Sequence, residues 1–294
     1  MTDGAGRFAP SPSGELHLGN LRTALLAWLF ARSTDRAFLM RVEDLDRVRP
    51  GAEATQLSDL AAIRLDWDGD VVHQSQRIPL YDRVIQDLTD AGRTYECFCT
   101  RKEILNAASA PHAPQGAYPG TCRDLTPNQR AERRSTGRDP AIRLRADVVE
   151  FTVTDTLLGD YTGVVDDLVL RRSDGIPAYN LAVVVDDGAQ GIDQVVRGDD
   201  LLSSSPRQAY LATLLNIPIP HYAHVPLALN TDGKRLAKRD GAVTLADQLA
   251  QGNTAVDVLK MLAQSLCLQG DSPHDLLASF DPTALPREPW IVRG

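Results

Sequence analysis

Two stretches far apart in the chain carry residues suited to handling a nucleotide. Residues 7–20 read Arg-Phe-Ala-Pro-Ser-Pro-Ser-Gly-Glu-Leu-His-Leu-Gly-Asn and run directly into an apolar, helix-like segment. A strand that breaks at prolines and a glycine, followed by His17 where a helix begins, leaves backbone N–H groups and an imidazole where phosphate binds well. We therefore expect His17, Gly19 and Asn20 to bind ATP, although an ordinary turn histidine would show the same short pattern.

The second stretch is Gly233–Gly241, in which glycines enclose four cations within six residues. A charge run of this kind is usually a solvated surface loop. Nucleotidyl transfer, however, needs cations that close over the phosphates, because charge builds up on them in the transition state. Lys234 and Lys238 are the candidates for that role.

A third group of residues could hold a metal ion. Cys97, Cys99 and Cys122 lie within a stretch that is rich in proline and glycine and shows little periodicity. Three thiolates and one further ligand would complete a tetrahedral zinc site, and His112 is a chemically conventional fourth ligand. The alternative is three buried structural cysteines. Cys267 lies far off in an apolar, helix-like stretch, and we expect it in the core.

At the beginning of the chain, segments with the pattern of a strand alternate with segments with the pattern of a helix, and these elements must position the candidate residues. Strands are predicted over 6–9 and 37–42, and helices over 21–32, 53–64 and 80–91. This rhythm indicates a parallel α/β sheet.

The pattern changes after residue 95 and later returns. Residues 95–140 read as a loop-built insertion, and the short β-rich pieces of 141–172 suit a small mixed or antiparallel sheet. The α/β rhythm resumes with 179–187, a buried strand or a helix. The remaining predictions are a helix over 204–215, a strand over 224–229, mostly helix over 245–268, and an irregular, proline-rich last 25 residues.

Composition narrows the class of protein. The chain has 294 residues, of which 43% are hydrophobic, enough for a substantial core. A net charge of −8 argues against a generally basic nucleic-acid coat but is compatible with a local basic face. No window is apolar for the roughly 18 residues that a membrane span needs. We expect a cytoplasmic monomer with reduced cysteines and no membrane partner.

Together the two nucleotide stretches resemble the signature pair of class I aminoacyl-tRNA synthetases. Residues 17–20 are similar to the His-Ile-Gly-His element, and Lys234–Arg239 is similar to the Lys-Met-Ser-Lys-Ser loop. Asn20 replaces the final histidine, a substitution associated with the glutamate-specific branch. Ala237 replaces the serine but keeps both flanking cations.

Further segments resemble the glutamyl-tRNA synthetases in particular, and they follow in the expected order. They are residues 7–24, Arg41–Asp46, Pro177–Ala182 and Val196–Leu201. The resemblance implies an α/β fold: a Rossmann-like class I catalytic domain with a zinc-binding insertion and a short helical C-terminal region. The domains would be 1–94 (first half of the catalytic domain), 95–172 (zinc-binding, acceptor-type insertion), 173–242 (second half with the lysine loop) and 243–294 (helical region and irregular tail).

The resemblance also implies a glutamate pocket. Arg7 and Arg197 would bind carboxylate in a bidentate manner, which lysine does less well. Glu43 would hold the α-ammonium group. Taken singly, Glu43 reads as a surface charge before a turn, and Arg7 as a structural ion pair with the acidic run 43–46. The other residues implied for the pocket are Tyr179, which would orient the ammonium through its hydroxyl, and Ala9 and Ser11, which would line it.

For the metal, the resemblance favours a tyrosine as the fourth ligand. Tyr118-Pro-Gly-Thr-Cys122 fits the family's Tyr-x-x-x-Cys pair. One zinc would then be bound by Cys97, Cys99, Tyr118 and Cys122. A site closed by four protein ligands has no open position, so this zinc would be structural.

The length of the chain favours one branch of the family. A full glutamyl-tRNA synthetase would continue into a helical domain that reads the anticodon, whereas about 55 residues follow Arg239. The glutamyl-queuosine tRNA(Asp) synthetases have such a head-only architecture. The resemblance then implies activation of L-glutamate by ATP and Mg²⁺ and its transfer to queuosine-containing tRNA(Asp).

Three other functions stay open at this point. One is a discriminating glutamyl-tRNA synthetase head that charges a tRNA 3′ end. Another is a non-catalytic, synthetase-like RNA-binding paralogue, which the intact His17, Lys234 and Lys238 disfavour. The last is an adenylyltransferase for a small acid, which would have no reason to keep the glutamate-pocket segments.

Overall fold

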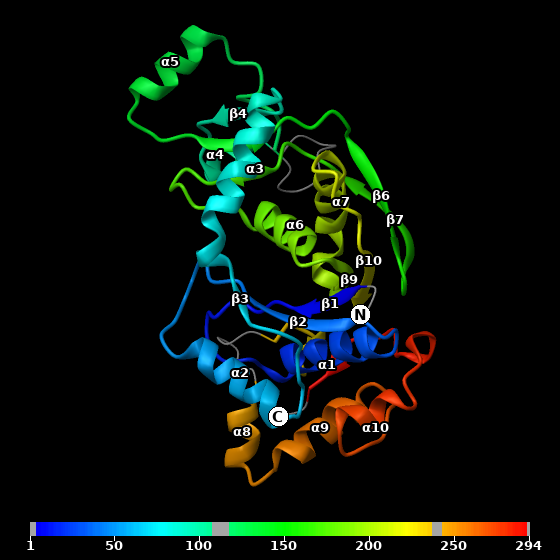
Figure 1. The fold of residues 1–294 in the computed structure, drawn as a ribbon. Coiled ribbons are helices and arrows are strands. Elements are labelled where there is room, and N and C mark those ends of the chain that lie inside the picture. Colours follow the sequence, from blue (N-terminus) through cyan, green and yellow to red (C-terminus); the bar gives the residue numbers. More distant parts are fainter. Residues whose placement is uncertain (1–3, 108–117, 237–242, 293–294) are drawn as a thin grey trace.

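The computed structural model describes residues 4–107, 118–236 and 243–292 (Figure 1). Its centre is a seven-stranded sheet in the order β3-β2-β1-β9-β10-β6-β7. The strands are β1 (Ala5–Phe8), β2 (Ala37–Val42), β3 (Val72–His73), β6 (Glu150–Asp155), β7 (Gly159–Val164), β9 (Ile192–Gly198) and β10 (His221–Val225). All neighbours pair in parallel except β6 and β7, which form an antiparallel hairpin.

The chain order reverses at β1. From this strand, β2 and β3 extend the sheet to one side, and β9 and β10 extend it to the other. Open α/β sheets bind their ligands outside the carboxyl ends of the strands at such a reversal. The fold therefore predicts a site at the ends of β1, β2 and β9.

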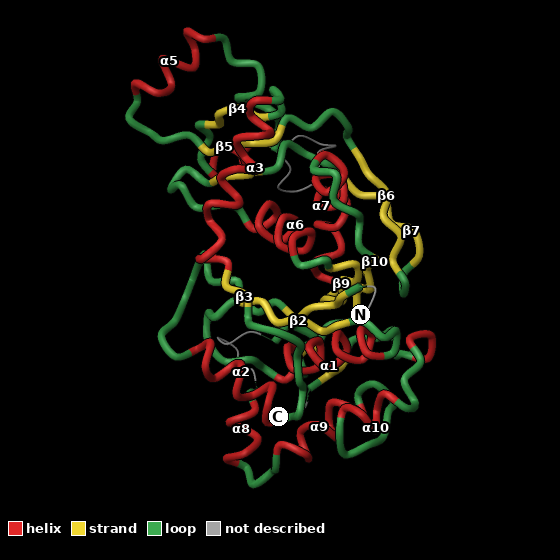
Figure 2. The backbone as a smooth tube through the Cα atoms, viewed as in Figure 1, coloured by secondary structure: helices red, strands yellow, loops and turns green. Residues whose placement is uncertain are grey.

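Helices cover both faces of the sheet (Figures 1 and 2). On one side lie α1 (Leu18–Arg32), α9 (Ala255–Gln264) and α10 (Pro273–Leu277), and on the other lie α6 (Tyr179–Ala189) and α7 (Ser205–Leu214). Further helices are α2 (Ala52–Ala62), α3 (Ile78–Asp90), α4 (Arg101–Ala107), α5 (Pro127–Ser135) and α8 (Leu245–Ala250). In the described ranges, no helix combines the length and the apolarity needed to cross a membrane.

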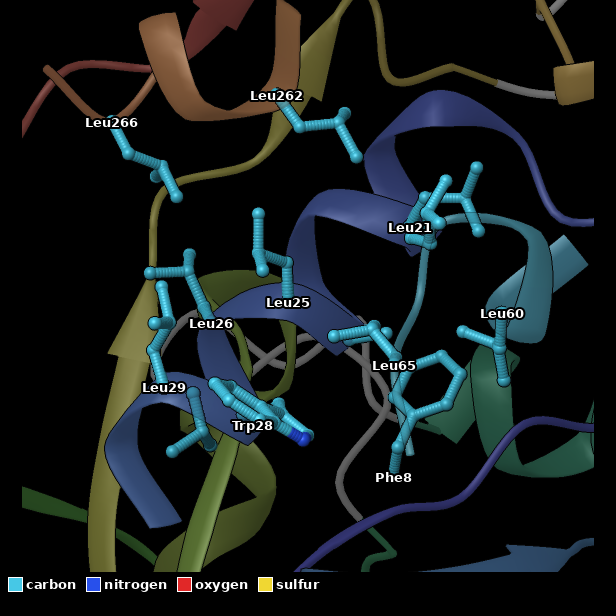
Figure 3. Packing of buried hydrophobic residues seen from close by; sticks show 14 of the residues in the cluster. Phe8, Leu21, Leu25, Leu26, Trp28, Leu29, Leu60, Leu65, Leu262 and Leu266 are labelled. Atoms are coloured by element: carbon cyan, nitrogen blue, oxygen red, sulfur yellow. The ribbon is translucent and has the colours of Figure 1, made fainter. Parts of the chain in front are cut away.

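The main core forms around α1, which is buried on most of its surface. Its leucines pack between the sheet and the C-terminal helices, so that Leu25 and Leu29 share one cluster with Phe8 of β1 and Leu262 of α9 (Figure 3). A helix that is apolar on nearly all sides is stable only in such an interior position. The core thereby fixes the start of α1 relative to the sheet.

Side chains alternate between the two faces along the strands. Phe8, Met40 and Val196 join the core on the α1 side. The residue next to each of them, Arg7, Arg41 and Arg197, forms polar contacts on the other side, which include Asp187 of α6 and Gln208 of α7. One face of the sheet is therefore apolar, and the other carries buried charge near the strand ends.

Residues 95–172 contribute to two different sheets. β4 (Thr94–Cys97), β5 (Ala141–Leu144) and β8 (Val169–Arg171) form a separate antiparallel sheet, as the sequence predicted for this region. The prediction was wrong for Glu150–Asp155, because β6 pairs with β10 of the central sheet. The domain boundaries inferred from the sequence stay a prediction.

The C-terminal residues pack back onto the fold. Trp290–Ile291 forms β12, which pairs with β11 (Ala228–Leu229), and Leu285 lies in the main core. The prediction for Cys267 was wrong: this residue is exposed. Its positive φ of 59° takes the chain out of the helical path just after α9, so its side chain does not follow the helix's apolar face.

Candidate active site

The loop between β1 and α1 is fixed by neighbouring elements. Glu43 N–H, just after β2, donates to the carbonyl of Pro10 at 3.0 Å, and Gln56 Nε2 of α2 donates to the carbonyls of Ser11 and Gly14. Ala9 and Ser11 thus lie in a held loop at the carboxyl end of β1, next to Glu43. This placement agrees with a role as pocket lining.

His17 is the N-cap of α1 and forms a reciprocal pair with Asn20. Its Nδ1 accepts from Asn20 N–H at 3.2 Å, and Asn20 Oδ1 accepts from His17 N–H at 3.2 Å. Because Nδ1 is an acceptor here, the ring proton lies on Nε2, the nitrogen that can donate to an anion. Asn20 therefore sets the tautomer and orientation of His17 at the positively polarised end of α1.

Gly19 is needed for close packing. A β-carbon at this position would lie 2.9 Å from the Cβ of Ala228 and 3.0 Å from His17 Nδ1. Glycine therefore allows β11 to approach α1 at the His17 cap. The close approach of a nucleotide to Gly19, which the sequence suggested, stays a prediction.

Both ends of the lysine-rich stretch are attached near this cap. Lys234, which is exposed, ends a turn in which its N–H donates to Asn230 Oδ1 at 2.8 Å. Beyond the stretch, Val243 accepts from Leu18 N–H at 2.9 Å, and Thr244 forms a bridge with His17. The intervening residues 237–242, including Lys238, lie outside the described residues. The chain nevertheless lies close to α1 both before these residues and after them.

Arg7 meets a carboxylate that the sequence analysis did not propose. Its Nε and Nη2 donate to Asp187 Oδ1 and Oδ2 at 3.2 and 3.3 Å. Arg41 Nη1 donates to Asp187 Oδ1 at 2.8 Å, and Arg41 Nη2 lies 3.5 Å from Glu43 Oε1. The alternative in which Arg7 pairs with the run 43–46 is thus wrong, because the ion pair that the structure shows for it is with Asp187 of α6.

Burial and the two arginines act in opposite directions on the pKa values of Glu43 and Asp187. Burial raises the pKa of Glu43 above its usual value, although Arg41 and Arg7 act in the opposite direction. Burial would also raise the pKa of Asp187, but Arg7 and Arg41 outweigh it and lower that pKa. The Glu43 side chain is 11% exposed, so it is a largely buried carboxylate that would gain from a cation, and not a surface charge before a turn.

Tyr179 and Arg197 complete the group from α6 and β9. The pKa of Tyr179 is raised by burial and by the charge of Glu43, and it also responds to Arg197 and Arg7. Although 42% of Tyr179 is exposed, the charges of Glu43, Arg197 and Arg7 all influence the pKa of its hydroxyl. The structure brings Arg7, Glu43, Tyr179 and Arg197 together at the carboxyl ends of β1, β2 and β9, where the fold predicts a ligand.

The three clustered cysteines meet Tyr118 in the separate sheet region. Their Sγ atoms lie within 4.8 Å of one another, with Cys99 and Cys122 at 3.5 Å. Tyr118 Oη lies 3.3 Å from Cys97 Sγ and 3.9 Å from Cys99 Sγ. This cluster can bind a metal ion. The rival ligand His112 lies outside the described residues.

Comparison with known proteins places the chain in a family. A family model described as tRNA synthetases class I (E and Q), catalytic domain, matches residues 5–285. The chain is 68% identical over 289 residues to a glutamyl-Q tRNA(Asp) synthetase from Nocardia farcinica, which covers 98% of this chain and 93% of that protein. The chain belongs to the glutamyl-Q tRNA(Asp) synthetase family of class I synthetases.

Two further comparisons agree with this family. A glutamyl-Q tRNA(Asp) synthetase from Cutibacterium acnes is 54% identical over 279 residues, covering 93% of this chain and 79% of that protein. A solved glutamate tRNA ligase from Elizabethkingia meningosepticum, in complex with its amino acid, matches with a TM-score of 0.81 and 27% identity. That match covers 97% of this chain and 66% of the ligase, so the chain spans just under two thirds of that protein. The predicted class I synthetase fold is confirmed.

Sequence reasoning within this family missed several buried polar residues. Arg41 stood in a quoted motif but received no role, and Asp187 lay at the end of an apolar run of uncertain structure. The signal for Asp187 was an acidic pair directly after three valines. Three other residues were also missed: His224 and Gln208, which accept from Arg197, and Asp155, which contacts His224.

Proposed function

We propose that this chain activates L-glutamate with ATP and transfers it to the queuosine base of tRNA(Asp). The observation that carries the activation step is the convergence of Arg7, Glu43, Tyr179 and Arg197 beside the His17 cap. The relatives' names support the queuosine-containing acceptor, since the first of them aligns over 93% of its length.

The charges of the pocket suit an amino acid with two carboxylates. Glu43 is a largely buried acid whose raised pKa reflects the cost of its ionised form, and an α-ammonium group would offset that cost. Arg197 is buried and has no carboxylate partner among the described residues, so a substrate carboxylate can approach it as a counter-charge.

Activation would join the α-carboxylate of glutamate to the α-phosphate of ATP, with pyrophosphate leaving in line. The carboxylate is already a nucleophile, so this step needs positioning and charge stabilisation and no general base. His17, through Nε2–H, together with Lys234 and Lys238, would bind the phosphates. Mg²⁺ bound with ATP would supply further charge neutralisation.

Transfer would follow from the same pocket. A hydroxyl on the cyclopentene ring of queuosine would attack the carbonyl carbon of glutamyl-adenylate. An ester forms, the bond between the carbonyl carbon and the phosphate oxygen breaks, AMP leaves with that oxygen, and the hydroxyl gives up its proton.

The cysteine cluster would hold one structural zinc. Ligands at about 2.3 Å from a tetrahedral zinc lie about 3.8 Å apart, close to the separations found among Cys97, Cys99, Cys122 and Tyr118. Tyr118 Oη is the best placed fourth ligand among the described residues. With four protein ligands, the ion would stabilise the sheet region and take no part in the reaction.

Exchange of labelled pyrophosphate into ATP tests the activation step. We expect exchange that depends on glutamate and proceeds without tRNA. Absence of exchange with glutamate would instead favour the non-catalytic paralogue. Charging of the 3′ end of tRNA(Glu) would favour the discriminating glutamyl-tRNA synthetase.

A further inference from the structure

Three buried arginines occupy the penultimate positions of neighbouring strands, yet they differ in how their charge is balanced. Arg7 and Arg41 both contact Asp187, and Arg41 also lies near Glu43. Arg197 is as buried as Arg7, each being 5% exposed, but it forms no ion pair with any residue of the described ranges. Burying a guanidinium charge without a carboxylate partner costs free energy, so the fold must stabilise Arg197 in another way.

Every acceptor that surrounds Arg197 is neutral. Its Nη1 donates to Gln208 Oε1 at 2.8 Å, and its Nη2 donates to Ser205 Oγ at 2.7 Å. Its Nε donates to His224 Nε2 at 3.1 Å. The arginine is thus held in one orientation by hydrogen bonds that leave its positive charge in place.

Gln208 can accept because its amide is itself oriented. Its Nε2 donates to Asn180 Oδ1 of α6 at 2.9 Å, so its Oε1 faces Arg197. Asn180 follows Tyr179 at the start of α6, so this hydrogen bond connects Gln208 to the segment that carries Tyr179.

His224 can accept because of Asp155. Arg197 and His224 are register partners on β9 and β10, and Asp155 ends the adjacent strand β6. His224 Nδ1 lies 2.6 Å from Asp155 Oδ2, so Nδ1 carries the proton and Nε2 keeps its lone pair for Arg197. The pKa of His224 is lowered by burial and by Arg197, against the effect of Asp155, in keeping with a neutral ring.

The imidazole also separates two charges. Asp155 is fully buried and would be the natural counter-ion of Arg197, but His224 lies between them. The carboxylate thereby fixes the position of the arginine without occupying its donors.

We propose that Asp155 and His224 are positioning residues that keep the charge of Arg197 available for a carboxylate of the substrate. This inference rests on the proposed function, since it assumes that the substrate is glutamate. It predicts that a neutral acceptor at position 224 preserves glutamate binding, whereas a carboxylate there replaces the substrate as the partner of Arg197.

The test compares His224→Gln with His224→Glu in glutamate-dependent pyrophosphate exchange, measuring KM for glutamate and for ATP separately. Loss of one charge-assisted interaction corresponds to about a tenfold to hundredfold rise in KM. We expect that rise for glutamate in His224→Glu, a change below about threefold in His224→Gln, and no change in KM for ATP in either. Asp155→Asn should also raise KM for glutamate, because an amide can donate to Nδ1 and turn Nε2 into a donor facing Arg197.

His221→Gln, at the exposed start of the same strand, is the matched control and should behave as the parent protein. Should His224→Glu or Asp155→Asn fail to fold, Ser205→Ala removes one neutral acceptor of Arg197 and should raise KM for glutamate alone. The inference would be overturned if His224→Gln and His224→Glu had equal KM values for glutamate, or if KM for ATP rose in parallel. If the larger changes do not fold, an unchanged KM for glutamate in Ser205→Ala would overturn it instead. A parent protein that shows no exchange would overturn the proposed function itself and this inference with it.

Discussion

Asp187 accepts from Arg7 through both carboxylate oxygens, at 3.2 and 3.3 Å, and the same side chain binds Arg41 at 2.8 Å. One carboxylate of α6 therefore orients the arginines of two adjacent strands. The ends of β1 and β2 are thereby tied to α6, and Arg7 would contribute to the proposed glutamate site as part of this network.

Asp187→Asn should therefore destabilise the fold and weaken glutamate binding together. Removing one partner of a buried pair costs about 3–5 kcal/mol, because it leaves an uncompensated charge behind. Denaturant unfolding and KM for glutamate measure the two effects. Asp174→Asn, whose carboxylate pairs with Arg172 at the surface, is the control and should cost at most about 1 kcal/mol. Equal stabilities of the two variants would contradict the role of Asp187.

The pH dependence of glutamate binding should reflect Glu43. Burial raises its pKa, and only the ionised carboxylate attracts an ammonium group. KM for glutamate should therefore rise as pH falls, and it should do so closer to neutrality than the ordinary glutamate pKa of about 4.3. Glu43→Gln should raise KM at neutral pH, where the parent carboxylate is ionised, and should lose this acid limb. An acid limb that persists in Glu43→Gln would assign the titration to another group.

Metal content should follow the cysteine cluster. The purified chain, reconstituted with zinc, should hold about one ion per molecule and lose it in the double variant Cys97→Ser and Cys99→Ser. Tyr118→Phe should also weaken zinc binding, whereas His112→Gln should not. Zinc retained by Tyr118→Phe and lost from His112→Gln would reverse the assignment of the fourth ligand, and a parent chain that takes up no zinc would refute the site.

The lysine stretch should matter for activation and not for stability. Lys238→Ala should slow formation of glutamyl-adenylate by about a hundredfold or more, the usual effect of losing a group that stabilises transition-state charge. The melting temperature should not change, because a charged lysine contributes little to an apolar core. Single-turnover formation of adenylate measures the rate, and a change below about threefold would contradict the role of Lys238.

The sequence predicted the local elements better than their long-range contacts. The apolar run 37–42 and the leucine- and alanine-rich run 21–32 identified β2 and α1, because the residues of each run by themselves favour that element and its burial. The apolar run 179–187 fits either period, and only packing against the sheet makes it a helix. The pairing of Glu150–Asp155 with β10 depends on residues more than sixty positions away, which no local pattern encodes.

The same limit applies to the site. Arg7, Glu43 and Arg197 could be proposed because a family resemblance joined motifs that are distant in sequence. Asp187 and His224 were missed because their importance comes from partners on other strands. A lone histidine in an apolar strand has no distinguishing local signal, and its role becomes visible only when Asp155 and Arg197 are seen on either side of it.

Glutamylation of tRNA(Asp) with and without queuosine tests the central proposal most directly. Purified chain, ATP, Mg²⁺ and labelled glutamate are incubated with each tRNA, and the position of the label is mapped after nuclease digestion. The account predicts label on the queuosine base of modified tRNA(Asp), and none on unmodified tRNA(Asp) or on the 3′ end of tRNA(Glu). Label at a tRNA 3′ end, or equal labelling with and without queuosine, would contradict it.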